Sequence, residues 1–374
     1  MSEENRVITA GKEGRKERNY GIDLLKILAM FLMVVEHMFS FGGMRDGLSG
    51  PMYYSMIAAV LLCTWPVNAY ALSTGVTGCG KAHRLSRLVE LYLQVLFYTV
   101  SIGVILYLLG FVSIGEMLRN FFPLISNRYW YFTAYFFLFF LMPYLDKLID
   151  SMDHFRLTVI LSLLCLLNAL SISGNIFHWN YGLSGSWLCI LYLFGGLLAK
   201  YRIAERVSAR ALLLIAAFCF LLSYLGYLIV PGLAMRFAGV HYGEYQFMKF
   251  TAPTILLWAL ALVALFSKIK VKSAVMQRWI VRVSALTFGV YLLHADSLLV
   301  DVLYRDKLSY LLHHSTAYAL GMLLLYSAAL FAVCLAVDFL RSRLFTLLKI
   351  DRLSGRLAAW LKKTYAALSA RVRA

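Results

Sequence analysis

Ten apolar segments, separated by short polar stretches that are mostly basic, run through the sequence. An α-helix needs about 20 residues to cross the roughly 30 Å hydrocarbon core of a bilayer, and several segments reach that length. The pattern predicts an all-α integral membrane protein with about ten transmembrane helices. The predicted spans are residues 20–42, 53–79, 88–110, 128–148, 157–174, 184–199, 211–230, 247–267, 285–301 and 316–340.

The second apolar segment is interrupted by Pro66 and by the run Ser73-Thr74-Gly75. We expect its far end, around that run, to bend or unwind. Irregular backbone at membrane depth is tolerated only against protein or a water-filled cavity. The far end of this span is therefore expected to lie in such surroundings.

Composition limits the class of protein. Hydrophobic residues make up 61% of the 374 residues and charged residues 15%, with a mean hydropathy of +0.73. A soluble multidomain enzyme would need much more charged surface. We therefore expect one membrane domain, residues 20–340, between a polar cytoplasmic tail, 1–19, and a basic amphipathic cytoplasmic tail, 341–374. The last segment is typical of a helix that lies on anionic membrane lipid.

The net charge of +17 reflects membrane topology and does not indicate nucleic-acid binding, because the basic residues lie between apolar spans. With the N-terminus inside, the inner segments carry 28 of the 36 Lys and Arg residues, and the outer loops carry 6. This asymmetry predicts that both termini are cytoplasmic. The six cysteines have no metal-ligand spacing, so neither a disulfide framework nor a metal site is expected.

The first span carries four titratable residues: Asp23, Lys26, Glu36 and His37. Charged groups in hydrocarbon are costly, so they indicate function. Asp23, Lys26 and His37 fall on one helical stripe, and Glu36 lies off it, where it can face a neighbouring pocket wall. Lys26 and His37 are about 16 Å apart in depth. Such a face suits a long ligand with its charged end near Lys26 and its reactive end near His37.

Simpler explanations exist for these residues. Asp23 and Lys26 have the spacing of a helical ion pair that reaches the membrane interface. His37 lies deep in the span, and its alternative role is a buried hydrogen bond between helices. As a neutral imidazole, His37 can take the proton from a hydroxyl that attacks a thioester carbonyl.

Arg84-x-x-Arg87 lies on the predicted cytoplasmic side, where the third span begins. Arginines there can hold phosphate groups through forked hydrogen bonds. Inner loops also collect arginines for topological reasons alone. Together with the stripe of the first span, the pair indicates coenzyme A thioester as a ligand, because that molecule has a phosphorylated head and a long thin arm.

Several motifs together resemble acyltransferase family 3, integral-membrane proteins that O-acylate bacterial cell-envelope glycans. The resemblance covers nearly the whole chain. It lies in Gly21-Ile22-Asp23-Leu24-Leu25-Lys26, Val35-Glu36-His37, Ser73-Thr74-Gly75, Arg84-x-x-Arg87, Trp130-Tyr131-Phe132 and Phe288-Gly289-Val290-Tyr291-Leu292-Leu293-His294.

The resemblance implies a multi-pass enzyme of the bacterial cytoplasmic membrane that transfers an acyl group, usually acetyl, from cytoplasmic acyl-CoA to a hydroxyl. It maps the essential histidine onto His37, a basic donor-binding residue onto Lys26, and the acyl-CoA arginines onto Arg84 and Arg87. Lysine replaces the family's usual arginine at Lys26, which keeps the charge but loses the planar fork. The usual Ser-Gly pair is Ser73-Thr74-Gly75 here.

The remaining candidates have weaker signals. Glu36 is a candidate catalytic partner of His37, and Asp23, Trp130 and His294 are candidate substrate-binding residues. Trp130 also suits an aromatic belt, and His294 and Asp296 suit hydrogen bonds between helices. His241 and Glu244, with Tyr242 and Tyr245, form an outer loop that can contact a sugar or simply face solvent.

The first functional hypothesis is therefore a membrane O-acetyltransferase. Its predicted partners are acyl-CoA, a glycan or other hydroxylated acceptor, and membrane lipids, and no bound cofactor is expected. The second is a carrier for a small solute such as an amino acid, because intramembrane charges also mark transport paths. A structural or regulatory membrane protein is the third. The arginine pair and the stripe from Lys26 to His37 favour the enzyme.

Overall fold

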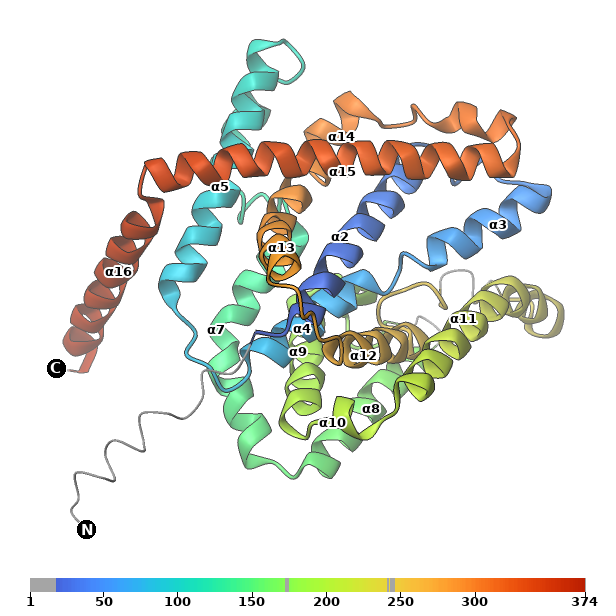
Figure 1. The fold of residues 1–374 in the computed structure, drawn as a ribbon, viewed down its shortest axis with the longest axis horizontal. Coiled ribbons are helices and arrows are strands. Elements are labelled where there is room, and N and C mark those ends of the chain that lie inside the picture. The colour runs from blue at the N-terminus through green and yellow to red at the C-terminus, as the bar shows by residue number, and fades with distance from the viewer. Residues whose placement is uncertain (1–17, 172–174, 241, 243–245, 374) are drawn as a thin grey trace.

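The computed structural model describes residues 18–171, 175–240, 242 and 246–373, and within these residues the secondary structure is entirely helical (Figure 1). The first half contains α2 (Tyr20–Phe41), α3 (Gly50–Leu61), α4 (Pro66–Gly78), α5 (Leu85–Leu108), α6 (Ile114–Arg119), α7 (Trp130–Ser151) and α8 (His154–Leu170). The second half contains η1 (Asn180–Gly182), α9 (Gly185–Lys200), α10 (Ile203–Arg206), α11 (Ala209–Ala238), α12 (Pro253–Ser267), α13 (Ala274–His294), α14 (Ser297–Leu303), η2 (Ser309–His313), α15 (Thr316–Leu347) and α16 (Ile350–Arg373).

The prediction of an all-α membrane protein is confirmed. Six helical segments of the described chain are long and apolar enough to cross a membrane, and the bent pair α13 and α14 makes a seventh. Three shorter apolar helices, α8, α9 and α12, coincide with further predicted spans. Every predicted span therefore matches a helix or a pair of helices, although the count of ten crossings is not confirmed.

The break in the second span lies earlier than predicted. α3 ends at Leu61, and α4 begins with Pro66 at its first position, where the missing N–H of proline costs no hydrogen bond. The expected unwinding around Ser73-Thr74-Gly75 was wrong, because those residues are helical. A Cβ added to Gly75 would lie 2.3 Å from the carbonyl oxygen of Tyr192 in α9. The small residue thus allows α4 and α9 to pack closely.

Three other boundaries also differ. α12 begins at Pro253 and not at residue 247, and α15 continues to Leu347. Residues 274–284 of the predicted connector before the ninth span are helical, since α13 begins at Ala274 and includes Arg278 and Arg282. The prediction used charged residues to place that boundary and was wrong, because α13 carries charged residues in its first turns, beyond the hydrocarbon core of the bilayer. α13 then bends by 69° into α14, where Asp296 accepts the hydrogen bonds that cap the new helix.

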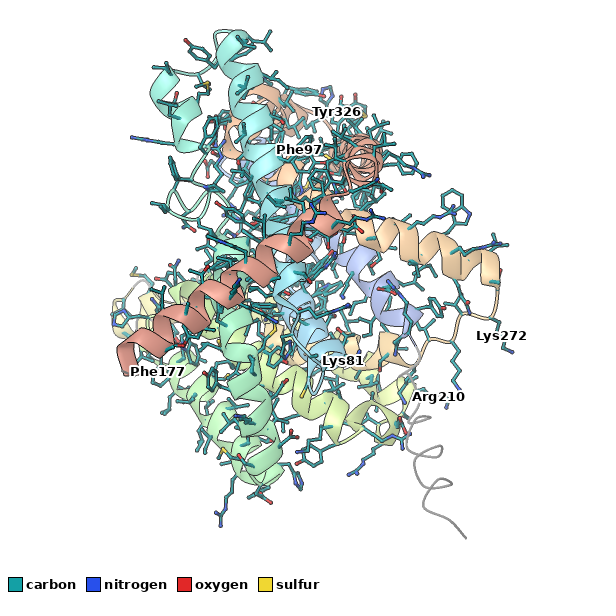
Figure 2. The ribbon with its side chains drawn as sticks, turned by 90° about the vertical axis from the view of Figure 1, so that its left-hand side faces the viewer. Lys81, Phe97, Phe177, Arg210, Lys272 and Tyr326 are labelled. Carbon is teal, nitrogen blue, oxygen red and sulfur yellow. The ribbon has the colours of Figure 1, made fainter. Side chains whose placement is uncertain are left out.

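α2 lies at the centre of the molecule and packs against α4, α12, α13 and α15 (Figure 1). α4 packs on α9, α9 on α7, and α12 on α11, while α16 crosses α5 (Figure 2). Lys81, Arg210 and Lys272 come from three of the predicted cytoplasmic connectors and lie on the same side of the molecule, at the lower right of Figure 2. Cytoplasmic termini remain a prediction, and most of the tail 1–19 lies outside the described residues.

Candidate active site

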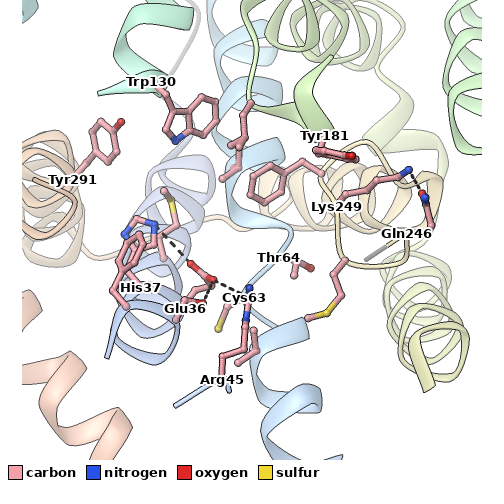
Figure 3. A pocket seen from close by; sticks show the side chains of 18 of the residues that line it. Glu36, His37, Arg45, Cys63, Thr64, Trp130, Tyr181, Gln246, Lys249 and Tyr291 are labelled. Atoms are coloured by element: carbon pink, nitrogen blue, oxygen red, sulfur yellow. Dashed lines mark hydrogen bonds and ion pairs between the residues drawn. The ribbon is translucent and has the colours of Figure 1, made fainter. Parts of the chain in front are cut away.

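A cavity of about 800 Å³ opens beside the C-terminal half of α2 (Figure 3). α2 supplies Glu36, His37 and Ser40 to its wall, and the break between α3 and α4 supplies Cys63 and Thr64. Aromatic side chains cover much of the rest of the wall, together with polar groups from the segment before α12. These residues are Phe41, Trp130, Tyr181, Tyr242, Gln246, Lys249, Phe250 and Tyr291.

His37 and Glu36 face the same cavity, although they are adjacent in sequence. Nε2 of His37 lies 3.7 Å from Oε2 of Glu36, and Figure 3 shows the carboxylate between His37 and Arg45. The hydroxyl of Ser40 donates a 2.6 Å hydrogen bond to Oε1 of Glu36, and the Arg45 guanidinium lies 3.9 Å from the same oxygen. This arrangement holds the Glu36 carboxyl group next to the imidazole in the cavity wall.

His294 lies behind His37 and outside the cavity wall. The two imidazole ring centres are 4.9 Å apart, and His294 is 1% exposed. Nδ1 of His294 bonds the carbonyl oxygen of Val290 at 2.7 Å. Nε2 of His294 and Nδ1 of His37 are both buried and have no hydrogen-bond partner among the described residues. The predicted substrate-binding role of His294 remains a prediction, but its position is that of a neighbour of His37.

A buried ion pair that the sequence did not predict holds the end of α13. Both oxygens of Asp296 accept hydrogen bonds from Arg128, at 2.8 and 3.2 Å, and Asp296 is fully buried. The Tyr129 hydroxyl donates to Asp296 at 2.9 Å and is also 2.7 Å from the Leu292 carbonyl oxygen. Arg128 and Tyr129 directly precede the Trp130-Tyr131-Phe132 motif, and an arginine at the start of a predicted span was the available signal.

A second cavity, of about 1330 Å³, opens at the other end of α2. Its wall is strongly basic, because seven cationic side chains line it against two acidic ones, Asp23 and Glu205. Asp23 pairs with Arg18 at 2.6 Å, and the predicted pair with Lys26 does not form. The seven cationic residues are Arg18, Lys26, Lys81, Lys200, Arg202, Lys268 and Lys270.

Lys26 and His37 therefore lie at two different cavities on one helix. Between them, Met30 is 3% exposed, and the Tyr70 hydroxyl donates a 2.7 Å hydrogen bond to the Lys26 carbonyl oxygen. The Lys26 ammonium group forms no hydrogen bond or ion pair within the described chain and faces the basic cavity. The structure thus confirms neither a continuous groove nor the simple ion pair with Asp23.

Arg84 and Arg87 line neither of these cavities. Arg84 precedes α5 and is exposed, and Arg87 forms an exposed ion pair with Glu90 at 2.9 Å. Their neighbour His83 instead pairs with Asp146 at 2.9 Å. The role of the arginine pair in donor binding remains a prediction.

Trp130 lines the first cavity, as a substrate-binding residue would. Of the predicted outer loop, Tyr242 lines the same cavity, while His241, Glu244 and Tyr245 lie outside the described residues. Burial lowers the pKa of Lys249, in the turn before α12, to about 8. In the described part of the chain no group of three His, Cys, Asp or Glu side chains is placed to hold a metal ion.

Comparison with known proteins identifies the family. No curated protein and no solved structure matches the chain. A family model described as an acyltransferase domain, Acyl_transf_3, matches residues 19–341. This match runs from α2 into α15 and includes every residue that lines the two cavities except Arg18. The chain therefore belongs to acyltransferase family 3 and is a membrane acyltransferase.

Proposed function

We propose that this membrane acyltransferase moves an acetyl group from cytoplasmic acyl-CoA to a hydroxyl of a cell-envelope polysaccharide or lipid-linked sugar in the bacterial cytoplasmic membrane. The main observation in support is a half-buried imidazole with a carboxylate 3.7 Å away in a cavity of about 800 Å³. The basic cavity at the other end of the same helix supports an anionic donor.

The donor fits the charges of the second cavity. Coenzyme A carries phosphate groups, and cationic side chains on four separate segments converge on this space. Lys26 is about 16 Å from His37 along the helix axis. A pantetheine arm is long and thin, so it suits a path along α2 once the side chains of Met30 and Tyr70 move aside.

The reaction follows from the groups around His37. The imidazole takes the proton from the acceptor hydroxyl while that oxygen attacks the thioester carbonyl. The carbon–sulfur bond then breaks, and the imidazolium returns the proton to the coenzyme A thiolate. Glu36 stabilises the imidazolium through its negative charge. The aromatic wall, including Trp130 and Tyr181, suits the apolar faces of a sugar ring.

A carrier for a small solute is the second candidate, but no observation in the basic cavity favours it. A solute pathway through the protein needs openings on both sides of a central site. Met30 is buried on α2 between Lys26, which lines the basic cavity, and His37, which lines the other cavity. A general base beside a carboxylate also serves transfer chemistry and has no role in simple uptake.

Transfer of labelled acetyl from acetyl-CoA tests the proposal. Membranes containing the protein are incubated with the label, and envelope glycan fractions are counted for wild type, His37→Ala and Arg84→Ala at matched expression. His313→Ala changes an exposed histidine outside both cavities and serves as the control. Label should appear with wild type and the control and vanish with His37→Ala.

Arg84→Ala and Lys268→Met together locate the donor. If the basic cavity holds the phosphates, Lys268→Met raises the KM for acetyl-CoA. If the arginine pair holds them, Arg84→Ala raises it. Equal labelling by wild type and His37→Ala would refute the enzymatic proposal and make uptake of small hydroxylated solutes the next assay.

A further inference from the structure

Two histidines meet between α2 and α13, and each has an unused ring nitrogen. The ring centres of His37 and His294 are 4.9 Å apart, and the ring planes are inclined by 36°. The unused nitrogens are Nδ1 of His37 and Nε2 of His294. Buried polar atoms normally have partners, so this complementary pair requires an explanation.

The tautomer of His294 follows from its backbone contact. A carbonyl oxygen only accepts hydrogen bonds, so the 2.7 Å contact with Val290 requires the proton of His294 on Nδ1. Nε2 then carries a lone pair and accepts. The surrounding backbone is held in place, because the Tyr304 hydroxyl donates a 2.6 Å hydrogen bond to the His294 carbonyl oxygen. Asp296, two residues further along, is held by Arg128 and Tyr129.

We propose that His294 is a positioning residue whose Nε2 accepts a hydrogen bond from Nδ1–H of His37 through one bridging water molecule. This bond fixes the tautomer of His37, so that Nε2 carries the lone pair and faces the cavity. Oε2 of Glu36, 3.7 Å from Nε2, lies beyond hydrogen-bond distance and so does not hold a proton on that nitrogen. The opposite tautomer of His37 would direct its Nδ1 lone pair towards the lone pair of His294 and leave both nitrogens unpaired. The catalytic use of this arrangement rests on the proposed function, whereas the tautomer itself does not.

The proton balance of the proposed reaction is unchanged. The acceptor hydroxyl gives its proton to Nε2 of His37, and the same nitrogen returns it to the leaving thiolate. Nδ1–H stays bonded to His294 throughout, so His294 neither gains nor loses a proton. A wrong tautomer would place N–H where the base must accept, and the attacking oxygen would meet a donor in place of a lone pair.

Nitrogen NMR of the full-length protein with 15N-labelled histidine tests the tautomer without any activity. Signals of the two residues are assigned by their loss in His37→Gln and His294→Gln. We expect both histidines to be protonated on Nδ1. A wild-type His37 protonated on Nε2 would overturn the proposal, even if the protein proves to be an active transferase.

Kinetics of two His294 variants separate positioning from simple packing. His294→Phe keeps a buried ring but removes the acceptor, whereas His294→Gln supplies a carbonyl oxygen near the position of Nε2. General bases contribute about 10²–10⁴ in rate, so kcat should fall about tenfold or more in His294→Phe. The KM for acetyl-CoA should not change, and His294→Gln should retain most of kcat. His314→Phe replaces an exposed histidine and is the control.

The outcomes are distinct. Full kcat in His294→Phe, with His37→Ala inactive, would refute the positioning role and leave the proposed function intact. Inactivity of every preparation, with the Nδ1 tautomer present in wild type, would count against the proposed function alone. If His294→Phe fails to fold, the wild-type spectrum and His294→Gln still decide the question.

Discussion

Removal of the Asp296 carboxylate should strongly destabilise the protein. The side chain is fully buried, and it accepts hydrogen bonds from Arg128, from the Tyr129 hydroxyl and from two backbone amides of α14. Asp296→Ala leaves the Arg128 guanidinium, only 14% exposed, without its counter-ion. Loss of one partner of a buried ion pair costs about 3–5 kcal/mol. For a chain of this size, that lowers the midpoint of thermal unfolding by about 4–6 °C.

The cysteines provide the assay. Cys63, Cys165, Cys189, Cys219 and Cys334 are free and buried, so a thiol-reactive fluorophore reports their exposure as the detergent-solubilised protein unfolds. Asp301→Ala is the matched control on the same helix, because the side chains of its ion pair with Arg305 are 51% and 44% exposed. An exposed pair contributes at most about 1 kcal/mol.

A double substitution distinguishes the cost of an unpaired buried charge from the cost of lost side-chain packing. Asp296→Leu combined with Arg128→Leu removes both charges, so it should be more stable than Asp296→Ala, in which the buried guanidinium stays unpaired. The reasoning is refuted if Asp296→Ala lowers the midpoint no further than Asp301→Ala. It is also refuted if the double variant is less stable than Asp296→Ala.

Three further predictions use other parts of the molecule. Gly195→Ala should destabilise the packing of α4 on α9, because the new Cβ would lie 2.2 Å from the Leu72 carbonyl oxygen. Gly321→Ala should not, because there is open space around Gly321. The midpoints of thermal unfolding of the two variants test this difference. Lys268→Met should raise the KM for acetyl-CoA about tenfold, because one charge-assisted contact with a phosphate is lost. Lys307 lies outside the basic cavity, so Lys307→Met is the control in the same transfer assay. The native pKa of Lys249, about 8, lies below the ordinary lysine value of 10.5. Between these values the unfolded chain binds the extra proton, so rising pH favours the native state. The unfolding midpoint of wild type relative to Lys249→Met should therefore rise between pH 8 and 10, and a difference that falls or stays constant would contradict the shift.

Periodicity predicted the central helix correctly because it depends only on neighbouring residues. Lys26 and His37 lie on one side of α2, at two cavities that suit the two ends of a long ligand. The same reasoning placed Glu36 off the stripe. The carboxylate still reaches the imidazole, because the cavity extends around more of the helix than one narrow stripe.

Contacts between distant segments were not predictable in this way. The pair Arg128 and Asp296 joins residues 168 positions apart, and hydropathy gives no information about which helices meet. Lys200, Lys268 and Lys270 were interpreted only as cytoplasmic charges, yet they converge with Lys26 on one cavity. In the sequence, the lysines and arginines that set membrane topology look the same as those that bind phosphate. Only the packing of the helices shows which of them meet at one cavity.

The separation of the two cavities has a chemical advantage for acyl transfer. A thioester beside a general base in open contact with water would be hydrolysed, and exclusion of water from the reacting groups prevents that loss. Met30 is buried between the cavities, and the Tyr70 hydroxyl is bonded to the backbone of α2, so both side chains stand in the way of a direct connection along the helix. An acyl-pantetheine arm that displaces these side chains would fill the path it opens. On this view the donor itself connects the basic cavity to His37, and the base meets the thioester only when the arm occupies the space between them.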